Sequence, residues 1–110
     1  MPSYMIQASY SAAAVTSMIK TPQDRAAAIR PMIEKLGGKL HGLWFALGEF
    51  DIVALVDMPD NVSATAVAMA VGGSGAMSAY RTTPLLTSAE ATDAMKRAGT
   101  FAYAAPQAAR

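Results

Sequence analysis

The segment KLHGLWFALGEFDIVALVDM at residues 39–58 constrains the fold most strongly. It consists of two apolar runs on either side of Gly48 and Glu49, and each run has the branched and aromatic residues of a strand. The two residues between the runs fit a type II′ hairpin turn, which needs Gly at its first position. The segment is therefore predicted to be a β-hairpin.

Both faces of this hairpin are apolar, because directly opposed residues share a face. The turn places Leu47 opposite Phe50, Phe45 opposite Ile52, and Trp44 opposite Val53. The bulkier face, which we expect to pack on helices, carries Leu43, Phe45, Leu47, Phe50, Ile52, Ala54 and Val56. The other face carries Leu40, Gly42, Trp44, Ala46, Asp51, Val53 and Leu55. A half-solvated sheet would alternate apolar with polar residues, so we expect the second face to be covered by the same face of another copy.

The other elements are predicted from caps, alternation and glycine runs. Residues 11–20 contain Ser and Thr and are expected to form a loop or short turn. Pro31 is expected to kink or restart its helix. The remaining predictions are a strand at 3–10, a helix that starts at Thr21-Pro22 and ends before Gly37, a helix capped by Asp60 or Asn61, a strand at 76–87 with an edge position at Pro84, and a helix capped by Ser88.

The predicted order is β-α-β-β-α-β with a C-terminal helix, which is the ferredoxin-like α+β arrangement. One domain is expected at 1–98, and a low-complexity tail at 99–110 that is mobile or lies over a partner subunit. Only 15% of the residues are charged, against about 25% in a typical soluble domain. This composition favours a homo-oligomer that covers apolar surface.

Composition also argues against several classes of protein. The net charge is +1 without a basic patch, which is not typical of nucleic-acid binding. The absence of cysteine excludes disulfides and thiolate chemistry. The N-terminus lacks the pattern of a signal peptide, and no apolar stretch approaches the ~20 residues that span a bilayer. We therefore expect a cytoplasmic protein without a membrane partner.

The stretch KLGGKLHGLWFALGEFDIVALVDMPDNVSA at 35–64 closely resembles the core of the GYD-domain proteins, and the resemblance extends through TTPLLT. The shared features are a two-glycine helix end, a Gly-x-aromatic-Asp hairpin and a Pro-Asp-Asn helix start. The resemblance implies a dimeric α+β barrel, in which two sheets face each other around a cleft. The sequence departs from the family pattern at Phe50, where a tyrosine is expected, so any role of that hydroxyl is lost here.

Polar and aromatic side chains on the face predicted to line this cleft are the candidate ligand-binding residues. They are Gln7, Ser9, Trp44, Asp51 and Arg81. Trp44, the only tryptophan, would stack on a planar ligand, or else pack in the core or interface. Gln7 and Ser9 share one face of a strand and need polar partners there. Arg81 would meet an anionic ligand or Asp51, or else lie on the surface.

Asp51 and His41 are the candidate catalytic residues. A carboxylate on an apolar cleft wall can have a raised pKa that suits a general base; the alternative is that Asp51 only makes hydrogen bonds near the turn. His41, the only histidine, is predicted on the Phe45 side of its strand and would need an orienting partner to act as a base. One histidine makes a poor metal site, so no metal or cofactor is predicted, although a single axial ligand leaves haem as a minor alternative.

The sequence thus leaves three functions open. The first is a protein that binds a small apolar or planar molecule in the cleft between two sheets. The second is a cofactor-independent isomerase or monooxygenase that uses Asp51 or His41 as its base. The third is a structural or regulatory assembly module without a ligand.

Overall fold

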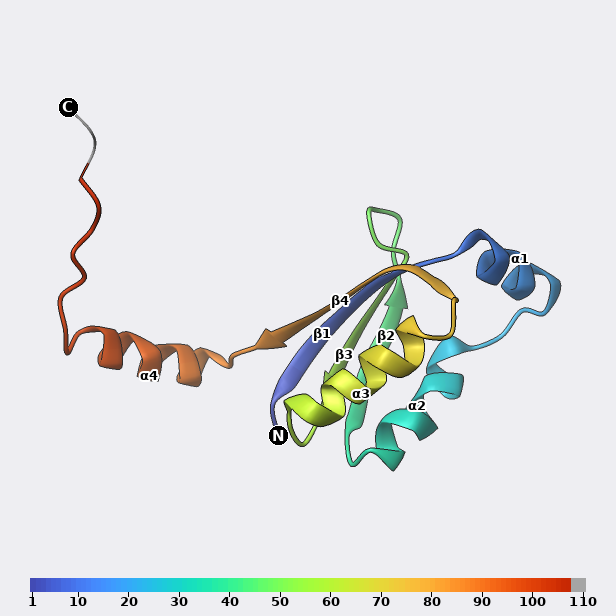
Figure 1. Ribbon diagram of the computed structural model, residues 1–110. Coiled ribbons are helices and arrows are strands. Elements are labelled where there is room, and N and C mark those ends of the chain that lie inside the picture. Colours follow the sequence, from blue (N-terminus) through green and yellow to red (C-terminus); the bar gives the residue numbers. More distant parts are fainter. Residues whose placement is uncertain (108–110) are drawn as a thin grey trace.

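The computed structural model describes residues 1–107. Its elements follow in the order β1 (Ser3–Tyr10), α1 (Ala12–Lys20), α2 (Arg25–Lys35), β2 (Lys39–Phe45), β3 (Ile52–Asp57), α3 (Asn61–Gly72), β4 (Met77–Leu85) and α4 (Ser88–Ala98). The strands form one antiparallel sheet in the order β2-β3-β1-β4. Helices α2 and α3 lie against one face of the sheet, and α4 stands apart (Figure 1). The predicted ferredoxin-like α+β fold is confirmed, with α1 as an additional helix.

The core lies between the sheet and the helices α2 and α3. Ile33 of α2 and Val67 of α3 are exposed by only 0% and 2%. The strand residues buried beneath them are Tyr4, Leu40, Ala54 and Val56, and a second cluster of Ala8, Tyr10 and Ile52 packs against α1. Burial of a Val or Ile side chain contributes about 1.5–3 kcal/mol. The hairpin face that was predicted to pack on helices does so in β3, whereas Phe45 near the end of β2 stays 59% exposed.

Near the hairpin loop, the register of β2 with β3 is the predicted one. At the far end, where β2 begins, the predicted register is wrong. Phe45 pairs with Ile52 and Trp44 with Val53. The register then shifts between Leu40 and Gly42, where β2 holds one residue more than β3. Such a bulge exchanges the faces of all residues beyond it. Leu40, predicted on the open face, is consequently buried and only 5% exposed.

The connection of the hairpin is also longer than predicted. The last ladder bond runs from the amide of Ala46 to the carbonyl of Asp51 at 2.8 Å, so residues 47–50 form the loop. Gly48 does not have the positive φ that a type II′ turn requires. The physical reason lies in β1, because the amide of Asp51 donates to the carbonyl of Ala8 at 2.9 Å and draws the chain away from a tight turn.

The helices differ from the prediction mainly at their starts. Residues 12–20 form α1 where a loop or short turn is predicted, because the Ser11 hydroxyl caps the helix by accepting from the amide of Ala14 and the alanines that follow have high helix propensity. Helix α2 starts at Arg25 with Asp24 as its cap, not at Thr21-Pro22. It continues through Pro31, which is exposed. Asp60 caps α3 as predicted.

Beyond β4 the chain leaves the body of the protein. Thr87, one residue before the predicted Ser88, caps α4 through a capping box with Glu90. None of the α4 residues is buried, and the radius of gyration is 18.2 Å, against about 13 Å for a compact domain of this size. Residues 99–107 continue without a helix or strand, and the end of the predicted tail, 108–110, lies outside the described residues. Within the described chain, no helix combines the length and apolarity needed to cross a membrane.

Candidate functional site

The face of the sheet turned away from α2 and α3, here called the open face, carries most of the candidate residues. No helix of residues 1–107 lies across it (Figure 1). It presents Ser3, Met5, Gln7 and Ser9 from β1, Trp44 from β2, Val53, Leu55 and Asp57 from β3, and Arg81 and Thr83 from β4. The middle of the open face thus holds apolar residues together with Gln7, and the other polar groups lie around them.

Four side chains form one row across the open face. Trp44 of β2 is opposite Val53 of β3, Val53 is opposite Gln7 of β1, and Gln7 is opposite Arg81 of β4. The row therefore begins with an indole on one edge strand and ends with a guanidinium on the other. Three intervals between strands span on the order of 14 Å. Three of the predicted ligand-binding residues are thus brought together over the length of a small planar molecule.

The indole of Trp44 lies over Gly42 of its own strand. A Cβ atom at Gly42 would come within 2.5 Å of Cη2 and 2.8 Å of Cζ2 of that ring. Trp44 is nevertheless 53% exposed. Glycine at this position therefore lets the ring lie low over the strand while its outer side stays accessible. The side chain is not part of the core.

Arg81 is held by an aromatic ring and not by the carboxylate considered from the sequence. Its guanidinium carbon lies 5.2 Å from the centroid of the Phe50 ring, which is a cation–π distance. Phe50 stands where the resemblance places a tyrosine, and it supplies the ring face without the hydroxyl. No ion pair joins Arg81 to Asp51 within residues 1–107.

Asp51 and Ser9 fix the hairpin loop to β1. The Asp51 carboxylate accepts from the amide of Tyr10 at 3.0 Å, and the Ser9 hydroxyl donates to the carbonyl of Glu49 at 3.1 Å. These bonds satisfy polar groups at the point where the ladder ends. The structure therefore places both residues where the hairpin loop meets β1, beside the row and not within it, and gives both a structural role; Asp51 also lines the groove between α1 and the hairpin.

His41 has the partner that a functional histidine needs, and the bulge provides it. The side chain is on the same side as Asp57, not on the predicted Phe45 side, and its Nε2 lies 2.8 Å from the Asp57 carboxylate. The Ser3 hydroxyl donates to the other oxygen of this carboxylate at 2.6 Å. The hydrogen bond from Ser3, and more weakly the contact with His41, hold the pKa of the Asp57 carboxyl below its usual value against the opposing effect of partial burial.

The three residues are of the types found in a nucleophilic triad, but their order differs. In such a triad the histidine lies between the serine and the carboxylate, whereas here Asp57 lies between Ser3 and His41. Ser3 therefore donates to the carboxylate directly and lacks the histidine base that activates the serine of a triad. The arrangement can instead orient His41 so that Nδ1 is the ring nitrogen that faces other molecules. Sequence reasoning missed Asp57 and Ser3, because they come together with His41 only through the bulge.

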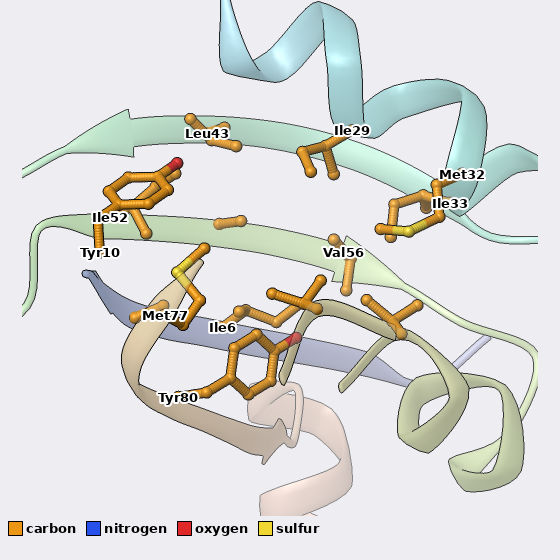
Figure 2. A pocket seen from close by; sticks show the side chains of 14 residues that line it. Ile6, Tyr10, Ile29, Met32, Ile33, Leu43, Ile52, Val56, Met77 and Tyr80 are labelled. Carbon is orange, nitrogen blue, oxygen red and sulfur yellow. The ribbon is translucent and has the colours of Figure 1, made fainter. Parts of the chain in front are cut away.

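A small cavity lies on the other side of the sheet, between it and helices α2 and α3 (Figure 2). Its volume is about 40 Å³. It is lined by apolar side chains, among them Ile6 and Met77, and by the rings of Tyr10 and Tyr80. Burial raises the pKa of the Tyr80 phenol, and the nearby Thr82 hydroxyl lowers it by less. Ligand pockets are usually about 300–1,000 Å³. This space is therefore a packing defect of the core and not a ligand site.

The fold and the open face define a ferredoxin-like α+β protein with one unpartnered sheet face. A family model for the GYD domain matches residues 4–95, and the chain belongs to this family. No curated protein matches the chain, and no solved structure matches it. The matched range runs from β1 into α4, so the row across the open face and the His41–Asp57 pair both lie within the family domain. Among residues 1–107, no three His, Asp or Glu side chains are grouped so that they could hold a metal ion.

Proposed function

We propose that the protein is a homodimer that binds a small planar or apolar molecule in a cleft between the open faces of its two copies. The observation that supports this most is the row from Trp44 through Val53 and Gln7 to Arg81. A sheet face that carries an exposed indole and apolar neighbours needs a cover. A second copy of the same face would supply it in an isologous C2 dimer.

The chemistry of the row suggests the kind of ligand. A planar ring system would stack on the Trp44 indole and contact Val53, and burial of such a surface drives binding. The Gln7 amide would donate to or accept from a polar substituent at the centre of the row. Arg81, exposed and supported by Phe50, would bind an acceptor or anionic group at the far end. The proposed ligand is therefore a planar apolar body with an oxygen-rich end.

Native mass spectrometry of gently purified protein tests both parts of the proposal. We expect a dimer that carries bound mass or takes up the planar anionic dye anilinonaphthalene sulfonate. Trp44→Ala or Gln7→Leu should weaken dye binding at least about tenfold, which corresponds to ~1.4 kcal/mol. Met69→Ala, a change at a residue of α3 that is 73% exposed, is the matched control and should have no effect.

The outcomes separate the two parts. A dimer that carries no extra mass and binds no dye would refute ligand binding and leave a structural assembly module. A monomer at micromolar concentration would refute the shared cleft itself.

The His41–Asp57 pair favours a second candidate function, a cofactor-independent enzyme with His41 as its base. Of the two bases considered, His41 has an orienting carboxylate at 2.8 Å, whereas Asp51 is engaged with the Tyr10 amide. A base that removes a carbon-bound proton from the ligand would exchange that proton with solvent. Deuterium incorporation into the bound molecule in heavy water, lost in His41→Gln and retained in Asp51→Asn, would establish this function. No incorporation in the unmodified protein would exclude it.

A further inference from the structure

Helix α4 has an apolar stripe with nothing of its own chain over it. Ala91, Ala94, Met95 and Ala98 follow the spacing that places residues on one side of a helix. None of them is buried, and Met95 is 70% exposed. The segments next to the helix continue the pattern, since Leu86, Phe101 and Tyr103 are 68%, 70% and 78% exposed.

The opposite side of α4 is polar and already paired. Asp93 and Arg97 form an ion pair at 2.9 Å, one turn apart. Helices of this length are marginal in water unless an apolar side packs on another element. A well-capped helix with one charged and one apolar side is therefore expected to have a partner surface.

A groove with matching chemistry lies at the other end of the molecule. It runs between α1 and the hairpin and has a volume of about 550 Å³. Its apolar walls include Val15, Met18 and Ile19 of α1 and Phe45 and Leu47 of the hairpin, and its polar lining residues are Gln23 and Asp51. Ile19 is 73% exposed, and Leu47 is fully exposed. Its apolar area is thus unusually accessible for a single chain.

The chain cannot fill this groove with its own α4. The groove adjoins the Tyr10 end of β1, whereas α4 starts after Leu85, which pairs with Ser3 at the opposite end. The eight residues of β1 span roughly 26 Å. Met95 lies only about 11 Å along α4 from its start, and two residues connect β4 to the helix. The distance is too great for an intramolecular contact between Met95 and the groove.

A two-fold arrangement of the open faces removes this mismatch. If the axis runs between the sheets and across the strands, the Ser3 end of one copy lies over the Tyr10 end of the other. Each α4 then leaves its own sheet at the end of the partner copy that carries the α1–hairpin groove. In an isologous dimer both contacts form at once.

We propose that α4 is an exchanged arm, which packs its Ala91–Met95–Ala98 side into the α1–hairpin groove of a second copy of this chain. This inference rests on the dimer proposed above and adds the contact that closes each end of the cleft. The arm would cover the exposed side chains of Ile19 and Leu47. Because two arms and two grooves bury apolar area in addition to the open faces, loss of one such contact should weaken the dimer about tenfold or more.

Cross-linking tests the arm directly, since the chain contains no cysteine. The variant Ile19→Cys/Met95→Cys is treated with a short bismaleimide linker at a concentration where light scattering shows a dimer. The control, Val62→Cys/Met95→Cys, places the first thiol on α3, where Val62 is 79% exposed, close to the value for Ile19. Denaturing electrophoresis then separates links between chains from links within one chain.

We expect links between chains in the Ile19 pair and few in the Val62 pair. A dimer in which both pairs link equally, or neither links, would overturn the arm and leave the open-face dimer intact. In the Ile19 pair, links within single chains would overturn the arm as well, because they would mean that α4 folds back onto the groove of its own chain. A monomer without links would refute the dimer and the arm together. A reduced dimer affinity in Met95→Asp, with a control Lys96→Ala unchanged, is the supporting result that does not need the cysteines.

Discussion

Substitution of Gly42 by alanine tests how Trp44 is held on the open face. An added Cβ would come within 2.5 Å of the indole Cη2 atom, a separation at which the ring must move. What moves is the far end of a side chain that is already 53% exposed. Displacing a side chain to a less favourable rotamer costs about 0.5–1.5 kcal/mol, so the fold should survive Gly42→Ala with a small loss.

Because Trp44 is the only tryptophan, its fluorescence reports this movement without interference. We expect the emission of Gly42→Ala to shift and its quenching by acrylamide to change, while the free energy of unfolding in urea falls by less than about 1.5 kcal/mol. Dye binding should weaken as well, because the stacking surface is displaced. Gly48→Ala is the matched control, since a Cβ there meets nothing within 4 Å.

Two results would refute this reasoning. Emission and quenching identical to those of the unmodified protein would mean that the indole does not lie over Gly42. A loss of more than about 3 kcal/mol, beyond what overpacking commonly costs, would mean that the bulged backbone and not the indole resists the Cβ atom.

Two further predictions concern the elements that position the site. Gly38→Ala should lower the free energy of unfolding in urea by about 1–3 kcal/mol, because its Cβ would lie 2.5 Å from the carbonyl oxygen of Asp57 and 2.6 Å from Sδ of Met58. The control Gly72→Ala, whose Cβ meets nothing within 4 Å, should leave the free energy of unfolding unchanged. Equal losses in the two variants would contradict the steric argument. Asp57→Asn should lower the unfolding temperature at neutral pH, and this effect should disappear in acid, below the ordinary pKa of an aspartate. The folded-state pKa of Asp57 is lowered by Ser3 and His41, so its stabilisation is present above the ordinary pKa of an aspartate and disappears as the pH falls through the lowered value; a loss independent of pH would exclude this linkage.

The parts of the fold that follow from local chemistry were predictable. Asp60 caps α3, the glycine run after it ends the helix, and Pro84 lies on the edge strand β4, where its missing amide does no harm. The register of Phe45 with Ile52 also followed, because the two apolar runs lie close together in sequence. Helix α1 did not, since the Ser and Thr residues that suggested a loop are exposed and the Ser11 cap outweighs them.

The candidate site likewise has parts that the sequence predicts and parts that it does not. Alternation alone put Gln7 and Trp44 on the open face, and the register then aligned them with Arg81. The bond from the Tyr10 amide to Asp51 could not be read from the sequence, because it depends on how the loop meets β1. The contact of Arg81 with Phe50 likewise joins residues that are far apart in the chain.

The bulge at His41 escaped prediction for a reason that also explains its effect. A one-residue slip normally reveals itself by moving polar residues into the core, but β2 is apolar on both faces, so Leu40 fits on either side. Apolar packing alone therefore specifies the register of this strand weakly. The His41–Asp57 contact, together with the bond from Ser3, exists in one register only. These polar groups thus fix the pairing of β2 with β3 beyond the bulge, whereas Trp44 stays opposite Val53 in the register that the hairpin alone predicts.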